Sequence, residues 1–380
     1  MKKKFIIFMA VFLLAFASIA LPVIAEPTIN ISAFSCCLID YNTGKILYAK
    51  NENERHQIAS MVKLMTTLLT FEEIEAGNLS ETEKIVVSSN ASGMGGSQMF
   101  LDANTEYVVS DLIKGMVVCS ANDASVALSE KICGTTEVFV AKMNAKAKLL
   151  GLQNTLFCNC TGLPSGEQYS TARDVSLITK ELLKHSGYYK YSKIWMEDFT
   201  HPSGRITGLT NTNKLIKHYA NCDSGKTGFT NEAKFCLSAS GKKDNFRAIA
   251  TVIGAPSSKE RFNDVKSLLN YGFACYKGEI VFNKNKELDE TLQVKKGKTD
   301  KLPIMCKEDL ILTMPKNIKA NIKINFELNQ NIVAPIKKGD VVGKVKAVEG
   351  DYCAEVELIA SQDIAKANYW DYIKKIAQKW

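Results

Sequence analysis

The sequence predicts an α+β domain with an antiparallel sheet and a helical cluster, followed by a small all-β domain and a C-terminal amphipathic helix. Predicted strands over residues 34–50 and 226–254 enclose a long run of helices, which is typical of a sheet built from both ends of one domain. After about Lys284, Lys, Asn and Asp become frequent and short alternating strands appear. The 380 residues also exceed the length of one typical domain.

The first 25 residues have the pattern of a signal peptide. Lysines at positions 2–4 precede an uncharged apolar run over residues 5–21, and small residues at 23–25 predict cleavage after Ala25. An uncleaved membrane anchor is the alternative. Because the segment carries three lysines and no acid, its removal lowers the formal net charge from +8 to +5. A modest positive charge favours an anionic partner such as a cell wall and is too scattered to indicate nucleic-acid binding.

The first predicted domain covers residues 28–280 and opens with a hairpin. Residues 34–40 and 45–50 flank Asn42-Thr43-Gly44, a turn that needs glycine. Apolar residues then recur so densely from Ser60 that a buried helix is predicted.

Later elements of this domain follow from capping and periodicity. Thr171-x-x-Asp174 is a capping box that opens a helix to Lys184. Further helices are predicted over residues 110–120, 121–132, 138–150 and 259–275, and strands over residues 226–230, 233–240 and 246–254.

The C-terminal part is predicted as a β-sandwich over residues 284–360 and a helix over residues 363–380. The strands are expected at residues 292–294, 311–313, 320–327 and 352–358. In the helix, Tyr369, Ile373, Ile376 and Trp380 form one stripe, and lysines occupy much of the rest. This pattern favours a helix that lies on the bacterial membrane surface, with packing against its own β-domain as the alternative.

The 11 cysteines are an odd number and do not form a disulfide framework. Cys36-Cys37 and Cys158-x-Cys160 lack the spacing of zinc ligands, so neither a metal nor another cofactor is expected. We expect most cysteines to be small buried residues, and a Cys158–Cys160 redox pair stays open.

Ser60-Met61-Val62-Lys63 is the strongest chemical feature. Positions i and i+3 share a helix face, so the Ser60 hydroxyl and the Lys63 amine can meet. A serine hydroxyl needs an adjacent base to become a nucleophile, and a lysine serves as that base only where burial lowers its pKa. The alternative is a Ser that caps a helix and a Lys on the surface.

Two further motifs follow in order. Ser120-Ala121-Asn122 stands at a predicted helix-to-helix turn, where Ser120 could instead cap the second helix. Lys226-Thr227-Gly228 opens a predicted strand, where Gly lets a substrate backbone approach and Lys226 can hold a carboxylate, unless it forms an ordinary hairpin. This combination of motifs is a known signature of penicillin-binding proteins and class A β-lactamases.

The chain resembles serine-type D-alanyl-D-alanine carboxypeptidases, the low-molecular-mass penicillin-binding proteins of peptidase family S11. The resemblance spans roughly residues 30–255 and implies a serine β-lactamase/transpeptidase-like domain. It is carried by Ala59-Ser60-Met61-Val62-Lys63-Leu64-Met65-Thr66, Gly96-Ser97-Gln98-Met99, Ser120-Ala121-Asn122-Asp123-Ala124, Tyr169-Ser170-Thr171-Ala172-Arg173-Asp174, Asn211-Thr212-Asn213-Lys214-Leu215 and Lys226-Thr227-Gly228-Phe229-Thr230.

The resemblance implies hydrolysis of the terminal D-Ala-D-Ala bond of peptidoglycan stem peptides, with β-lactams as inhibitors, at the outer face of the bacterial cytoplasmic membrane. Ser60 would be the acyl-ester nucleophile and Lys63 the proton acceptor. Ser120 would relay a proton and Asn122 would orient the substrate amide. The substrate-binding residues would be Lys226 and Thr227, with Gly228 beside them and the Phe229 backbone N–H sharing the oxyanion hole with that of Ser60.

The chain departs from the family at two places. Phe229 stands where some members have His, which puts carboxylate preference in doubt, and the cysteines in Cys158-Asn159-Cys160-Thr161-Gly162-Leu163 put that loop in doubt. Three alternatives stay open: a D,D-endopeptidase, a class A-like β-lactamase, and a non-catalytic wall-binding relative. Ala121 within the second motif disfavours the lactamase, and the intact site residues disfavour the non-catalytic relative.

Overall fold

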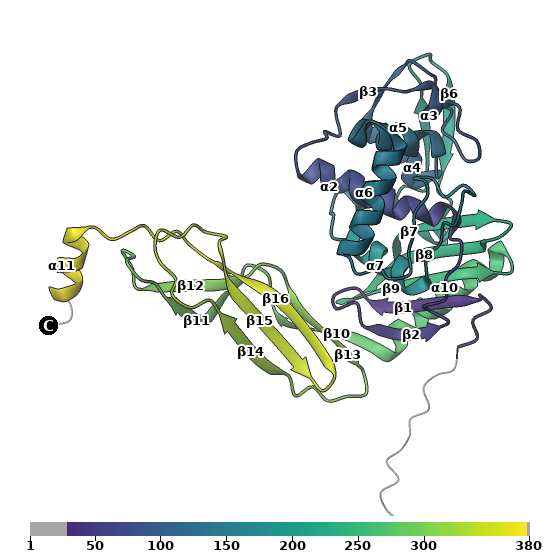
Figure 1. Ribbon diagram of the computed structural model, residues 1–380. Helices are drawn as coiled ribbons and strands as arrows, with labels where there is room; N and C mark the ends of the chain where they lie inside the picture. The colour runs from purple at the N-terminus through teal and green to yellow at the C-terminus, as the bar shows by residue number, and fades with distance from the viewer. Residues whose placement is uncertain (1–28, 378–380) are drawn as a thin grey trace, which may run out of the picture. The chain divides into compact units, whose positions relative to one another are not determined.

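The computed structural model describes residues 29–377, so the predicted signal peptide and Trp380 lie outside the described residues. A five-stranded antiparallel sheet combines strands from both ends of the first domain (Figure 1). Its order is β2 (Ile46–Lys50), β1 (Ser35–Asp40), β9 (Phe246–Ala255), β8 (Lys234–Lys243) and β7 (Cys222–Thr230). The predicted opening hairpin is confirmed, with Gly44 of its turn at φ +75°.

Helices occupy the long segment between the two groups of strands. They are η1 (Ala59–Val62, a 3₁₀ turn), α2 (Lys63–Glu75), α3 (Ser89–Ser92), α4 (Val109–Val118), α5 (Asn122–Cys133), α6 (Thr136–Leu149), α7 (Ala172–Leu182), α8 (Tyr188–Ser192) and α9 (Leu215–His218), and α10 (Ser258–Cys275) follows the sheet. The predicted capping box is confirmed, because Thr171 Oγ1 accepts a hydrogen bond from the Asp174 N–H at 3.0 Å. Two small two-stranded sheets were not predicted: β3 (Lys84–Val86) with β4 (Glu106–Val108), and β5 (Met196–Thr200) with β6 (Ile206–Thr210).

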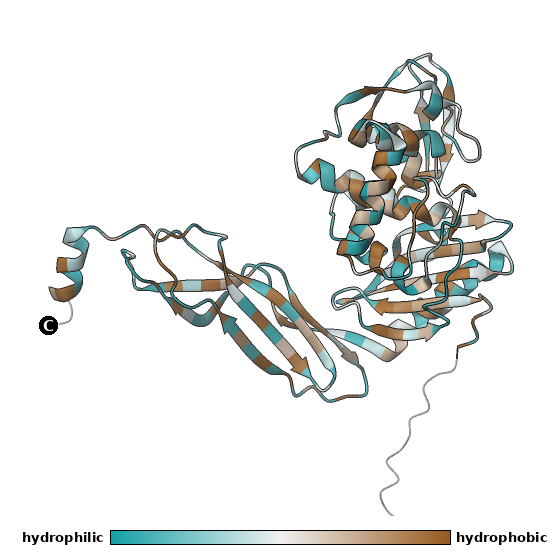
Figure 2. Cartoon of the chain, viewed as in Figure 1, coloured by the Kyte–Doolittle hydropathy of each residue, from teal (hydrophilic) through white to brown (hydrophobic). Residues whose placement is uncertain are grey.

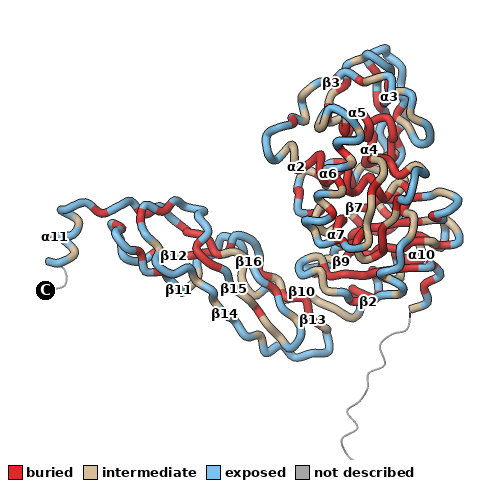
Figure 3. Tube along the Cα trace, viewed as in Figure 1, coloured by how far each residue is buried: buried red, intermediate tan, exposed pale blue. Residues whose placement is uncertain are grey.

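Opposite faces of the sheet are covered by α7 and α10. The Thr179 hydroxyl of α7 hydrogen-bonds the Ser238 hydroxyl of β8 at 2.8 Å. Gly241, three residues along β8, faces the other way, because a Cβ placed there would lie 3.1 Å from Phe273 of α10. Coverage on both faces explains why all six residues of β1 are buried. Brown apolar segments in Figure 2 coincide with the red buried segments of Figure 3 in these strands and in α4 and α5.

The C-terminal part is all-β, as predicted. A five-stranded sheet has the order β11 (Glu287–Gln293), β12 (Lys301–Cys306), β16 (Tyr352–Ala360), β15 (Val341–Glu349) and β14 (Lys323–Leu328). A second sheet pairs β10 (Tyr276–Phe282) with β13 (Leu310–Pro315). The sequence prediction omits β10, β12 and β15. β12 contains Pro303, and a proline within a run usually argues against a strand.

The last described helix is α11 (Tyr369–Ala377), which begins at Tyr369 rather than at residue 363 as predicted and has no buried residue. Among residues 29–377 no helix is both long and apolar enough to cross a membrane. Six of the 11 cysteines are buried, which confirms the expectation for most of them, and Cys158 and Cys160 are both free thiols.

Candidate active site

Ser60 lies in the 3₁₀ turn η1 rather than in a regular helix, immediately before α2 begins at Lys63. Its neighbour Ala59 has φ +46°, a left-handed conformation that is costly for a residue with a side chain. Ser60 is half-buried, whereas both neighbours in η1, Ala59 and Met61, are buried. The turn therefore leaves the predicted nucleophile accessible on an otherwise buried segment.

The Lys63 amine is fully buried and donates a hydrogen bond to Ser60 Oγ at 3.1 Å. Burial lowers the pKa of Lys63 from its ordinary 10.5 to about 7. A large share of these amines is thus neutral near pH 7, as a proton acceptor must be. The alternative of a surface lysine beside a capping serine is wrong.

A loop that the sequence left in doubt holds this amine in place. Lys63 Nζ donates to the Thr161 carbonyl at 2.5 Å. Asn159 Oδ1 accepts hydrogen bonds from the N–H groups of Thr161 and Gly162, at 3.1 and 2.7 Å, and so shapes the turn. A Cβ at Gly162 would lie 2.0 Å from the Ala59 carbonyl oxygen, so only glycine lets this loop approach η1.

Ser120 and Lys226 form a second hydroxyl–amine pair. Ser120 has φ +66° and separates α4 from α5, while Lys226 lies in the middle of β7 rather than at the start of a strand. The buried Lys226 Nζ donates to Ser120 Oγ at 2.7 Å and to the Thr227 carbonyl at 3.1 Å. Burial and then the charge of Lys63 lower the pKa of Lys226 well below its ordinary value.

Ser120 does not cap α5, because that helix has Ala121 at its N-cap and no side-chain cap. Strands β7 and β8 do form a hairpin, as the alternative for Lys226-Thr227-Gly228 supposed. An ordinary hairpin does not require a buried lysine amine, which is costly to bury, nor its hydrogen bond to a serine hydroxyl. The structure therefore brings the second and third motifs together.

Asn122 presents an acceptor without a partner. Its Nδ2 donates to the Gly95 carbonyl at 2.7 Å, which fixes the orientation of the amide. Its Oδ1 is buried and has no hydrogen-bond partner within the described part of the chain. Burial of an acceptor without a hydrogen bond costs free energy, so a ligand N–H that donates to Asn122 Oδ1 would remove that cost.

Strand β7 carries the remaining predicted residues and lies at the edge of the sheet. A Cβ on Gly228 would lie 2.5 Å from the Ile58 carbonyl oxygen, so glycine is required where β7 contacts η1. Thr227 is buried, whereas the Phe229 side chain is 52% exposed and its ring stacks on Phe235 with centroids 4.4 Å apart.

Several residues that hold the site were not predicted from sequence. Asn159, Thr161 and Gly95 contribute a turn or a carbonyl oxygen, and Arg261 donates to the Gly228 carbonyl at 3.3 Å. The spacing Asn159-x-Thr161-Gly162 is an Asx-turn pattern and is the one signal that could have indicated this loop. Because every residue has a backbone carbonyl oxygen, the sequence does not indicate which of them will accept a hydrogen bond in the site.

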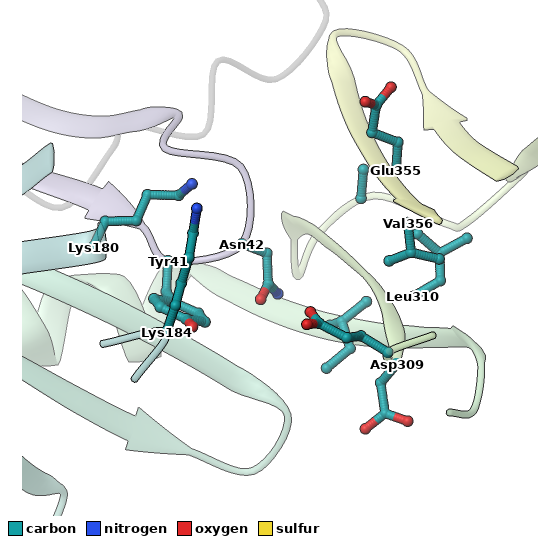
Figure 4. A pocket seen from close by; sticks show the side chains of 11 residues that line it. Tyr41, Asn42, Lys180, Lys184, Asp309, Leu310, Glu355 and Val356 are labelled. Atoms are coloured by element: carbon teal, nitrogen blue, oxygen red, sulfur yellow. The ribbon is translucent and has the colours of Figure 1, made fainter. Parts of the chain in front are cut away.

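The described part of the chain shows no second centre built around a metal ion. Residues 29–377 contain no group of three or more His, Cys, Asp or Glu side chains that could hold a metal ion. A pocket of about 300 Å³, lined by Lys180, Lys184, Asp309 and Glu355 among others, contains none of the predicted site residues (Figure 4).

Ser60 lies beside a buried lysine whose pKa is lowered, and a second lysine–serine pair involves the edge strand β7. Together these features define an active-site serine acyl-transfer enzyme of the penicillin-binding type. Comparison with known proteins specifies the family. The model of the D-alanyl-D-alanine carboxypeptidase family, Peptidase_S11, matches residues 22–257, and that of the penicillin-binding protein 5 C-terminal domain matches residues 276–366. The chain therefore belongs to the D-alanyl-D-alanine carboxypeptidase family of serine hydrolases.

Individual relatives agree with this assignment. D-alanyl-D-alanine carboxypeptidase DacF of Bacillus subtilis is 41% identical over 92% of this chain and 90% of its own length. DacA of Escherichia coli K12 is 32% identical over 92% of this chain and 89% of its own. Penicillin-binding protein 5 of Haemophilus influenzae, a crystal structure, has a TM-score of 0.69 and 34% identity over 89% of this chain and 99% of that one.

These findings confirm the predicted family, fold class and enzyme class, and they support cleavage of a D-Ala-D-Ala bond by a serine peptidase. The endopeptidase, β-lactamase and non-catalytic alternatives are not favoured.

Proposed function

We propose that this enzyme removes the terminal D-alanine from peptidoglycan stem pentapeptides outside the cytoplasm, through an acyl-enzyme on Ser60. The observation that carries this proposal is the fully buried Lys63 amine, 3.1 Å from Ser60 Oγ. Ser60 Oγ attacks the carbonyl carbon between the two D-alanines while Lys63 Nζ accepts its proton. The terminal D-alanine leaves with its nitrogen protonated, and water then hydrolyses the ester.

The other site residues have roles that their contacts support. Asn122 Oδ1 accepts the N–H of a substrate amide, the partner that this buried atom otherwise lacks. Ser120, hydrogen-bonded to Lys226, relays the proton to the leaving nitrogen. Lys226 with Thr227 binds the terminal carboxylate, and the N–H groups of Ser60 and Phe229 stabilise the oxyanion. β-Lactams acylate Ser60 in the same way.

The test combines labelling with product release. Purified wild type, Ser60→Ala and Ser80→Ala are incubated with a fluorescent penicillin and, separately, with a stem pentapeptide whose D-alanine release is measured. Ser80 is an exposed serine outside the site and is the matched control. Wild type and Ser80→Ala should label and release D-alanine, and Ser60→Ala should do neither. Labelling of Ser60→Ala, or a wild type that labels but releases nothing, contradicts the proposal.

We also propose that residues 1–25 direct export and that α11 binds the anionic surface of the bacterial membrane. Tyr369, Trp370 and Ile376 are exposed, and none of the α11 side chains is buried. Lys375 donates to the Gly297 carbonyl at 2.7 Å, so α11 is attached to its β-domain through a charged side chain while its apolar side chains stay uncovered.

Vesicle sedimentation tests the role of α11. We expect the full chain to sediment with anionic vesicles and a chain truncated after Asn368 to stay in solution. This truncation point retains Ile364, which is buried in the β-domain. Ile373→Ser with Ile376→Ser should reduce binding, whereas Val341→Ser, an exposed apolar residue on β15, should not. Equal binding by the truncated chain contradicts this part of the proposal.

A further inference from the structure

Arg261 on α10 is a buried cation without an acidic partner. Its side chain is only 7% exposed, and no carboxylate within residues 29–377 forms an ion pair with it. Its guanidinium lies between two aromatic rings, with centroid distances of 5.6 Å to Phe235 and 4.6 Å to Phe262. Burial lowers its pKa to about 10. Cation–π contact offsets only part of the cost of burying a charge, so an apolar side chain would fill this space more favourably.

Two of the three hydrogen bonds that Arg261 donates go to backbone carbonyls. Nη1 donates to the Gly228 carbonyl at 3.3 Å and to the Cys236 carbonyl at 3.4 Å, and Nη2 donates to Ser258 Oγ at 3.2 Å. Gly228 of β7 and Cys236 of β8 are partners in the strand pairing. Arg261 therefore joins the last part of β7 to its neighbour at the residue that contacts η1.

The Gly228 carbonyl belongs to the same peptide unit as the Phe229 N–H. In a trans peptide these two groups point in opposite directions. Because the Gly228 carbonyl shares a donor with the carbonyl of β8, the Phe229 N–H points away from β8, toward the open edge of β7. Gly228 itself lies against the turn that carries Ser60, since a Cβ on Gly228 would lie 3.3 Å from the Met61 nitrogen.

We propose that Arg261 is a positioning residue of the oxyanion hole. Its guanidinium holds the Gly228–Phe229 peptide unit so that the Phe229 N–H meets the negative charge that develops on the substrate carbonyl oxygen. A cation on the carbonyl draws electron density from the amide and makes the N–H a stronger donor. The stacking of Phe229 on Phe235, whose ring also contacts Arg261, holds the same peptide from its side-chain end. This inference rests on the proposed function of Ser60.

The experiment separates this role from a contact between Arg261 and the substrate carboxylate. An N-acyl-D-alanine boronic acid forms a tetrahedral adduct with a serine and places an oxygen in the oxyanion hole, yet it has no terminal carboxylate. Its inhibition constant and the kcat and KM for a stem pentapeptide are measured for wild type, Arg261→Gln, Arg261→Lys and Lys259→Gln. Lys259 is an exposed cation on the same helix and is the matched control.

We expect Arg261→Gln to lower kcat on the order of 10-fold with little change in KM, because removal of a whole oxyanion donor costs about 10²–10³-fold. The boronic acid inhibition constant should rise by a similar factor. Arg261→Lys, which keeps the charge but has less reach, should be intermediate, and Lys259→Gln should match wild type.

An unchanged boronic acid inhibition constant together with a raised KM in Arg261→Gln overturns the proposal, because it indicates a carboxylate contact. Equal activity of all four proteins overturns it as well. If Arg261→Gln does not fold, Arg261→Lys provides the same comparison. The boronic acid needs no D-alanine release, so a failure of the carboxypeptidase proposal would be seen separately.

Discussion

The pH dependence of acylation tests the state of Lys63 directly. Only the neutral amine accepts the Ser60 proton, so the acylation rate follows the neutral fraction of Lys63. With a pKa of about 7, that fraction is roughly 1% at pH 5, half at pH 7 and about 90% at pH 8. The second-order rate constant should therefore rise about 90-fold from pH 5 to pH 8 and then level off.

The assay is the rate of labelling by a fluorescent penicillin at pH 5, 6, 7, 8 and 9 at constant ionic strength. The penicillin carboxylate stays ionised throughout, so the profile reports the enzyme. Lys63→Arg should be inactive at every pH, because a guanidinium stays protonated. Lys180→Arg is the matched control, since Lys180 is a half-buried lysine of α7 outside the site and its replacement should leave the profile unchanged.

Two results would refute this reasoning. A rate that does not change between pH 5 and pH 8 would show that Lys63 is not the proton acceptor. A rate that still rises tenfold per pH unit beyond pH 8 would show that Lys63 keeps its ordinary pKa, so that burial does not have the electrostatic effect derived from the structure.

Four further predictions concern stability and local geometry. Native Lys63 has a pKa of about 7 against 10.5 in the unfolded chain, so the unfolded state binds more protons between these values and stability should rise with pH across this window. In Lys63→Met, relief of roughly 4 kcal/mol of burial cost at pH 7 outweighs about 1–3 kcal/mol for the orphaned Thr161 carbonyl. Its Tm at pH 7 should therefore rise by a few degrees while penicillin labelling is lost, and a lower Tm would contradict this balance. Gly162→Ala should slow labelling and lower the free energy of unfolding by at least about 1–3 kcal/mol, because alanine is strained at φ +83° and its Cβ meets the Ala59 carbonyl. Asp123→Asn should lower the free energy of unfolding in urea by about 1–3 kcal/mol. The two carboxylate oxygens of Asp123 accept the N–H groups of Met99 and Leu101 separately, whereas an amide has only one oxygen that can accept.

The sequence was most informative where a residue's chemistry and its local structure coincide. Thr171 caps α7 and Ser60 meets Lys63 because these contacts span three residues of one chain segment. That Ser120 and Lys226 belong to one site followed only from three motifs in a known order, and their direct hydrogen bond was not predicted. It could not come from periodicity, because 106 residues separate the two.

What the sequence could not predict depends on backbone groups and on tertiary contacts. The Thr161 carbonyl that holds Lys63 is common to every residue type, so no side chain marks it. Ser60 lies in a 3₁₀ turn rather than in a helix because β7 and the Gly162 loop press against that turn, a tertiary effect that overrides local propensity. Arg261 belongs to none of the recognised motifs, and its relevance appears only where α10 meets Gly228.

The two buried lysines are better understood together than separately. Burial is the main cause that lowers the pKa of each lysine, and the charge of Lys63 further lowers the pKa of Lys226. Two protonated amines in one site would repel each other, so protonation of one favours the neutral form of the other. A substrate carboxylate that binds at Lys226, as proposed, favours protonated Lys226 and thereby neutral Lys63. Under the proposed roles, binding of the substrate carboxylate at Lys226 would thus help to keep Lys63 neutral and able to accept the Ser60 proton.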